Sequence, residues 1–152
     1  MRTLSDLLNE SDLHLLALRE AMARCPQPLT EDHFVTRNPA LVAALDQFAY
    51  RFTKLQDVMS AQLFRRFALD VLHEPVESLP IIDILNLLER YGYLPSVVRW
   101  QEIRETRNQI THEYRLDPGE LIVMLAIAFG MVAEMSAILA KLKTICEEKN
   151  ER

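Results

Sequence analysis

One pattern constrains the fold of this chain more than any other, a regular spacing of apolar residues that begins near residue 40. The spacing alternates between four and three residues, through Leu41, Leu45, Phe48, Phe52, Leu55 and Met59. In an α-helix such residues form one stripe that packs against another helix in a bundle or coiled coil, and the stripe could also serve a dimer. Asn38 can cap this helix, and Pro39 suits its first turn. The pattern predicts a long helix from residue 39, with the stripe continuing to Phe67 or Val71.

Four further helices are predicted from apolar periodicity and from the residues at their ends. Two prolines, Pro26 and Pro28, stop the first and lead into a polar connector. Gly92 can take the left-handed conformation that ends a helix, and Ser96 and Asp117 can cap the two helices that follow. The expected helices cover residues 3–24, 81–94, 97–114 and 118 onward.

Composition supports an all-α fold in a single domain of residues 1–152. The chain has 49% apolar residues, 26% charged residues and only three glycines, which favours packed helices. Five helices with short connectors predict an antiparallel bundle of four to five helices. Cys25 and Cys146 are far apart and lack a CxxC pairing, so neither a disulfide framework nor a metal site is expected. The acidic N-terminal stretch does not resemble a secretory signal, so a cytoplasmic protein is expected.

The start of the last helix is the most apolar part of the chain. Residues 121–133, LIVMLAIAFGMVA, are thirteen residues almost without polarity. A membrane span needs about 18 to 20 residues, and Glu134 interrupts the run. We expect the buried central helix of a bundle and no membrane partner, with a membrane span as the alternative.

Charge is unevenly distributed along the chain. The net charge of −5 argues against a protein that coats nucleic acid, because that affinity comes from many contacts between basic residues and phosphate. Residues 51–66 nevertheless hold Arg51, Lys54, Arg65 and Arg66 against Asp57 as the only acid. These residues are either a local basic patch or ordinary solvated helix faces.

The octapeptide RNQITHEY, residues 107–114, places several polar side chains at the end of the predicted helix of residues 97–114. Trp100, Ile103, Ile110 and Tyr114 fall on one stripe of that helix, and Arg107 lies in the middle of it. A guanidinium aimed at the packed side is costly unless it finds partners. Arg107 is therefore either a functional group or an arginine paired with a nearby acid.

Asn108 and His112 are four residues apart and share a helix face, whereas Arg107 and His112 point about 140° from each other. One straight helix cannot focus both on one atom. Either the helix unwinds before His112, or a site takes its groups from two chains related by a twofold axis. For His112 alone, a surface histidine near a helix end is a third interpretation.

The stretch LLERYGYLPSVVRWQEIRETRNQITHEYRLDP resembles the HEPN superfamily, in particular its HepT-like toxins. The signature of these toxins is an arginine, four residues, a histidine, any residue and a tyrosine. Arg107, His112 and Tyr114 match it, and Asn108 follows the arginine. The resemblance covers residues 79–118, and residues 1–36 look like an N-terminal helical addition to the minimal bundle.

The resemblance implies a metal-independent, cofactor-free endoribonuclease that works as a homodimer and is the toxin of a pair with a nucleotidyltransferase-fold antitoxin. His112 would act as general base or acid, and Arg107 would stabilise charge on the phosphate. Asn108 would orient His112 or the phosphate, and Tyr114 would be the hydroxyl that the antitoxin modifies with AMP. Arg104 could extend the contact with RNA phosphates, as could the basic residues Arg51, Lys54, Arg65 and Arg66.

Two other functions fit the sequence. Some proteins of this superfamily resemble non-catalytic companions that help to form the substrate site of a nucleotidyltransferase, and the acidic net charge is compatible with that role. The third reading is a helical interaction module in which the motif is incidental.

Overall fold

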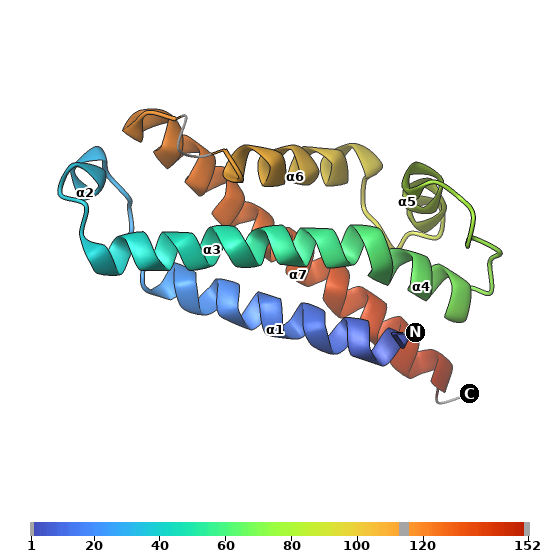
Figure 1. Cartoon of the computed structure of the whole chain (residues 1–152). Helices are drawn as coiled ribbons and strands as arrows, with labels where there is room; N and C mark the ends of the chain where they lie inside the picture. Colours follow the sequence, from blue (N-terminus) through green and yellow to red (C-terminus); the bar gives the residue numbers. More distant parts are fainter. Residues whose placement is uncertain (1, 113–115, 151–152) are drawn as a thin grey trace.

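The computed structural model describes residues 2–112 and 116–150, and this part of the chain is helical without a strand. Helices account for 78% of it, which confirms the predicted all-α class. The π-helical segment η1 joins α3 to α4, so these three elements form one continuous rod (Figure 1). The elements are α1 (Leu4–Ala23), α2 (Glu31–Val35), α3 (Pro39–Val58), η1 (Met59–Leu63), α4 (Phe64–Asp70), α5 (Ile81–Arg90), α6 (Val97–Ile110) and α7 (Pro118–Asn150).

The starts of α3, α6 and α7 form where the sequence predicts them, because each contains a capping residue, and Gly92 follows α5 as predicted. Asn38 Oδ1 accepts hydrogen bonds from the backbone N–H groups of Ala40 and Leu41, which caps α3. Ser96 Oγ caps α6 in the same way, and Asp117 Oδ1 caps α7. Gly92 ends α5 with a φ of 79°, the left-handed conformation that favours glycine.

Three local features differ from the sequence-based expectations. The polar connector that the sequence predicts after α1 contains the short helix α2. The long helix carries the wider π turn η1, which no spacing in the sequence predicted. Helix α6 ends at Ile110, with Thr111 at its C-cap, whereas the sequence pattern extended it to residue 114.

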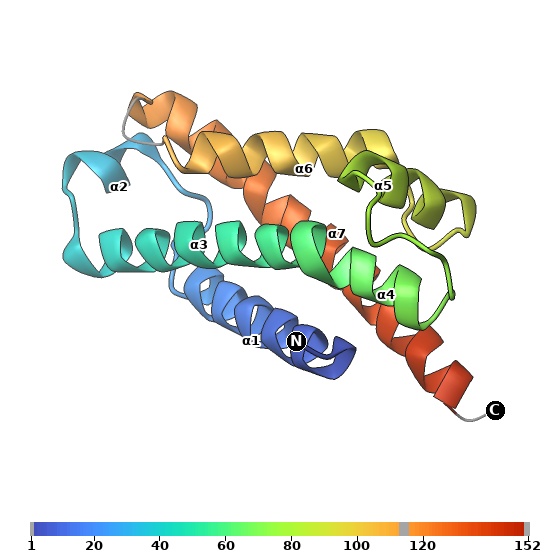
Figure 2. The same cartoon turned by 45° about the vertical axis from the view of Figure 1, so that its right-hand side comes forward.

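The helices enclose one apolar core. Every residue of the long stripe on α3 is buried, and the stripe continues through Phe67 to Val71 as predicted. Helix α1 lies along α3, α7 passes behind α3, and α6 lies on the other side of α3 (Figures 1 and 2). Trp100 of α6 is 1% exposed and packs edge-on against Phe64. This packing fixes α6 against the rod that α3, η1 and α4 form.

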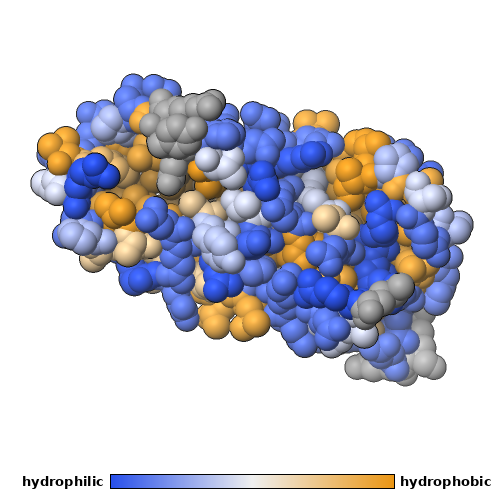
Figure 3. All heavy atoms as spheres, in the orientation of Figure 1, coloured by the Kyte–Doolittle hydropathy of each residue, from blue (hydrophilic) through white to orange (hydrophobic). Residues whose placement is uncertain are grey.

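Helix α7 packs against the core along one face, as expected of a core helix, but its opposite face is exposed. Met124, Leu125 and Ala128 are buried, whereas Val123 is 59% and Ile127 is 48% exposed. By length and composition α7 could cross a membrane, but a core helix of a soluble protein can pass the same test. On the face seen in Figure 3, apolar residues gather in separate areas divided by hydrophilic ones.

Candidate functional site

The motif residues Arg107, Asn108 and His112 lie at the C-terminal end of α6. Buried Ile103 and Ile110 hold this part of the helix against the core. Near its other end, α6 is tied to α7 by Arg99, which donates two hydrogen bonds to the carboxylate of Glu134, at 2.7 and 2.6 Å. These bonds lower the pKa of Glu134 and keep it ionised. The motif is therefore carried by a helix that is fixed at both ends.

Arg107 pairs with Asp57 of α3 through two parallel hydrogen bonds. Its Nε donates to Oδ1 at 3.0 Å, and its Nη2 donates to Oδ2 at 2.9 Å. The Arg107 side chain is 27% exposed and that of Asp57 is 46% exposed. The guanidinium on the packed side of α6 thus has an acidic partner from another helix, and this fork geometry fixes its orientation. Of the two interpretations of Arg107, pairing with an acid is observed, and it does not exclude a functional role.

Asn108 connects Arg107 to the region around His112. Arg107 Nη1 donates to Asn108 Oδ1 at 3.3 Å. Because α6 ends at Ile110, His112 follows the helix in a turn, where its N–H donates to the carbonyl of Gln109 at 3.0 Å. Asn108 and His112 both line a cavity of about 230 Å³, together with Glu105, Gln109 and Leu116. The helix therefore ends before His112, as the first alternative requires, and the second alternative, a site shared between two chains, stays a prediction.

Tyr114 lies outside the described residues, so its place relative to the motif is left as a prediction.

No cluster of three or more histidine, cysteine or acidic side chains that could hold a metal occurs within residues 2–112 and 116–150. Cys25 and Cys146 are both free thiols.

The basic residues of the long helix do not converge on the motif. Arg51 contacts His14 of α1, with Nη1 at 2.9 Å from Nδ1, and Lys54 lies over the ring of Tyr50. Arg65 donates to backbone carbonyls of the loop before α5. Arg66 pairs with Asp70. Each of these four basic side chains therefore contacts another part of the protein.

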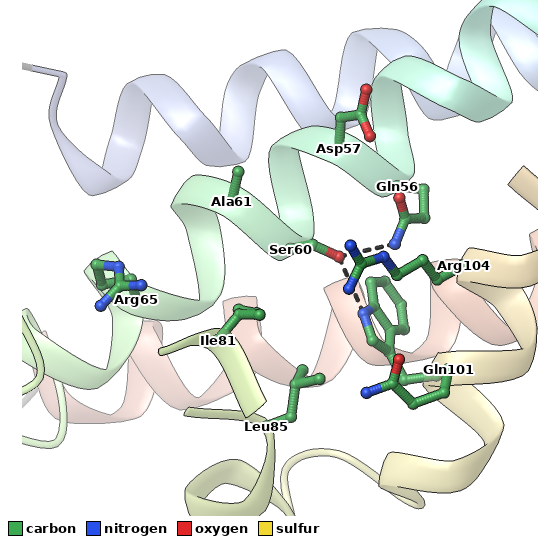
Figure 4. Close-up of a pocket in the computed structure, with 10 residues that line it drawn as sticks. Gln56, Asp57, Ser60, Ala61, Arg65, Ile81, Leu85, Gln101 and Arg104 are labelled. Carbon is green, nitrogen blue, oxygen red and sulfur yellow. Dashed lines mark hydrogen bonds between the residues drawn. The ribbon is translucent and has the colours of Figure 1, made fainter. Parts of the chain in front are cut away.

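A second, larger cavity lies between the rod and α6, beside the pair of Arg107 and Asp57. Its volume is about 620 Å³, and Arg104 of α6 and Arg65 both line it (Figure 4). Its polar wall comes from Gln56, Asp57 and Ser60. We call it the Gln56 cavity.

Sequence reasoning missed the roles of Asp57, Gln56 and Ser60. Asp57 could have been noticed as the only acid in the basic stretch of residues 51–66, but its partner is 50 residues away. Gln56 and Ser60 are four residues apart on a helix, which by itself predicts only a local contact.

Comparisons of this chain with protein-family models, with curated proteins and with solved structures each gave no match.

Proposed function

We propose that this chain is a metal-independent endoribonuclease of the HEPN type, the toxin of a pair with a nucleotidyltransferase-fold antitoxin in the cytoplasm. The active form is a symmetric dimer of antiparallel helical bundles. The reaction is attack of a ribose 2′-hydroxyl on the adjacent phosphate, with departure of the 5′-oxygen of the next nucleotide.

The observation that carries the proposal is the contiguous arrangement of the three motif residues at an exposed helix end. Asp57 holds the Arg107 guanidinium, and Asn108 links it to the cavity that His112 lines. A guanidinium is suited to the charge that builds on a phosphate, because it is planar and permanently ionised. A histidine titrates near neutrality and can take a proton from the 2′-hydroxyl or give one to the leaving oxygen.

A composite site explains the directions of the two principal groups. Arg107 reaches towards α3, whereas His112 lies beyond the end of α6. If a twofold axis passes near the end of α6, His112 of one copy approaches Arg107 of the other. We propose that Tyr114, two residues after His112 in the sequence, is the hydroxyl that the antitoxin modifies with AMP, which would add charge and bulk.

The test is cleavage of single-stranded RNA by the purified chain in the presence of a metal chelator. Wild type should cut, and Arg107→Ala and His112→Ala should each lose about a hundredfold or more in rate. Arg90→Ala is the control, because Arg90 is an exposed arginine on α5, away from the motif. Equal cleavage by wild type and His112→Ala would rule out the mechanism.

One observation favours a second function, the non-catalytic companion of a nucleotidyltransferase. Asp57 already neutralises Arg107 and accepts hydrogen bonds on both of its oxygens. If that pair is permanent, the guanidinium cannot turn to a phosphate. Expression in cells separates the two functions: growth arrest relieved by His112→Ala supports the nuclease, and harmless expression with tight binding of the partner supports the companion.

A further inference from the structure

The Gln56 cavity has the size and the two-sided chemistry of a small-ligand site. Its volume of about 620 Å³ falls within the range that such sites occupy. Ala61, Ile81 and Leu85 supply apolar surface, and Gln101 adds an amide opposite them (Figure 4). A flat ligand with an apolar face and a polar edge fits these walls.

Gln56 lines this cavity, and its side-chain amide is bonded to the protein through its nitrogen. The residue is only 2% exposed, and its Nε2 donates to Ser60 Oγ at 2.8 Å. Ser60 Oγ also accepts from Trp100 Nε1 at 3.0 Å, so both contacts hold the amide in place. Within residues 2–112 and 116–150, no donor forms a hydrogen bond with Gln56 Oε1. Gln56 Oε1 is not fully enclosed, so it can accept a hydrogen bond from water or from an N–H group of a ligand.

The positively charged side chain of Arg104 lies at the edge of the same cavity. Arg104 is exposed, and in the part of the chain that the structure describes its guanidinium has no ion pair or hydrogen bond. Arg104 precedes Arg107 by three residues on α6, so the two lie one turn apart on neighbouring positions. A strand whose phosphate meets Arg107 can therefore place its next phosphate at Arg104.

We propose that the Gln56 cavity receives one unpaired nucleobase of the RNA strand, next to the phosphate that is cleaved. The base lies between the apolar wall and the amide of Gln101, and an N–H on its edge donates to Gln56 Oε1. Arg104 holds the phosphate attached to that nucleotide. This inference rests on the proposed ribonuclease function and adds a substrate subsite to it.

The experiment measures binding of a short single-stranded RNA that wild type cleaves, using the full chain with His112→Ala to prevent cleavage. Ala61→Phe fills the cavity from an exposed position, and Ala43→Phe is the control at an exposed alanine on α3 outside the cavity. The RNA carries an abasic nucleotide at each position in turn. At one position beside the cleaved phosphate, the abasic change should raise Kd about tenfold, as loss of one base contact does.

With Ala61→Phe, intact RNA should bind about tenfold more weakly, and the abasic change should have no further effect. The Ala43→Phe control should keep the abasic effect. Gln56→Met, which removes the carbonyl oxygen at similar volume, should reproduce Ala61→Phe, with circular dichroism showing that the fold is retained. If the abasic effect persists unchanged in Ala61→Phe, the subsite is wrong although RNA cleavage by wild type stands. If wild type neither binds nor cleaves RNA, the proposed function fails and the subsite with it.

Discussion

At the scale of single residues, the pairing of Arg107 with Asp57 is an orienting contact more than a source of stability. Both side chains are partly exposed, and ion pairs in such settings contribute about 1 kcal/mol or less. Two parallel hydrogen bonds nevertheless restrict the guanidinium to one plane. In the nuclease this preorganisation would reduce the reorganisation needed when charge builds on the phosphate.

Asp57→Asn tests this role. The amide keeps the shape of the side chain but loses the charge and one acceptor, so Arg107 should be held less firmly. We expect RNA cleavage to fall about tenfold, a difference of about 1.4 kcal/mol in the barrier. The free energy of unfolding in urea should fall by no more than about 1 kcal/mol. Faster cleavage in the variant would show that Asp57 sequesters Arg107, as the companion function requires.

His14 of α1 provides a separate test that depends on pH. Its side chain is largely buried, and that loss of solvation lowers its pKa below the ordinary value of 6.5. Arg51 and Lys54 lower the pKa further, whereas Glu10 opposes them. The contact with Arg51 also requires a neutral ring, because Nδ1 must accept the hydrogen bond from the guanidinium.

The sign of the pH dependence follows from that lowered pKa. As the pH falls below 6.5, His14 takes up a proton in the unfolded chain before it does so in the folded chain. The contribution of His14 to the free energy of unfolding is therefore complete above that pH and declines below it. In His14→Gln the side-chain oxygen can still accept from Arg51, but the group no longer titrates. Urea unfolding from about pH 7 to about pH 5 should therefore show a larger loss of stability in wild type than in the variant. Parallel curves would contradict the assignment.

At the scale of elements, the π turn of η1 is tied to the packing of α6. Ser60 lies within η1, where its hydroxyl accepts hydrogen bonds from Gln56 and from the indole of Trp100. Met59 and Leu63, at the two ends of η1, are fully buried. The wider turn thus combines a core contact on one side with a polar contact to α6 on the other.

Ser60→Ala measures how much this polar contact contributes. The substitution leaves two largely buried donors without their acceptor, which costs about 1 to 3 kcal/mol. Urea unfolding followed by the fluorescence of Trp100, the only tryptophan, should show that loss. Ser5→Ala, at an exposed position of α1, is the matched control and should change stability by no more than about 0.5 kcal/mol. A similar small change in Ser60→Ala would mean that water replaces the hydroxyl.

The elements also show which features a sequence can predict. Helix starts at Asn38 and Ser96 were predictable, because a capping side chain bonds to backbone only two or three residues away. The short helix α2 was missed because five residues are too few to show a period. The pairing of Asp57 with Arg107 was missed because it depends on how α3 and α6 pack, and no local spacing encodes that.

At the scale of the whole molecule, α7 leaves apolar surface uncovered in a single chain. Val123 and Ile127 are one turn apart on its exposed face. Together with the separate directions of Arg107 and His112, this surface is compatible with a dimer. The mass of 17.6 kDa for one chain makes the dimer easy to distinguish by light scattering across a range of concentrations.

Mixing two inactive variants decides whether the site is shared between chains. Arg107→Ala and His112→Ala homodimers each lack one group at both sites. In a composite site, the mixed dimer contains one site with both groups intact and one with neither. Half of the dimers in an equal mixture are mixed, so about a quarter of wild-type cleavage should return. If His112 works with Arg107 of its own chain, as the end of α6 at Ile110 permits, each site of the mixed dimer lacks a group and no cleavage returns.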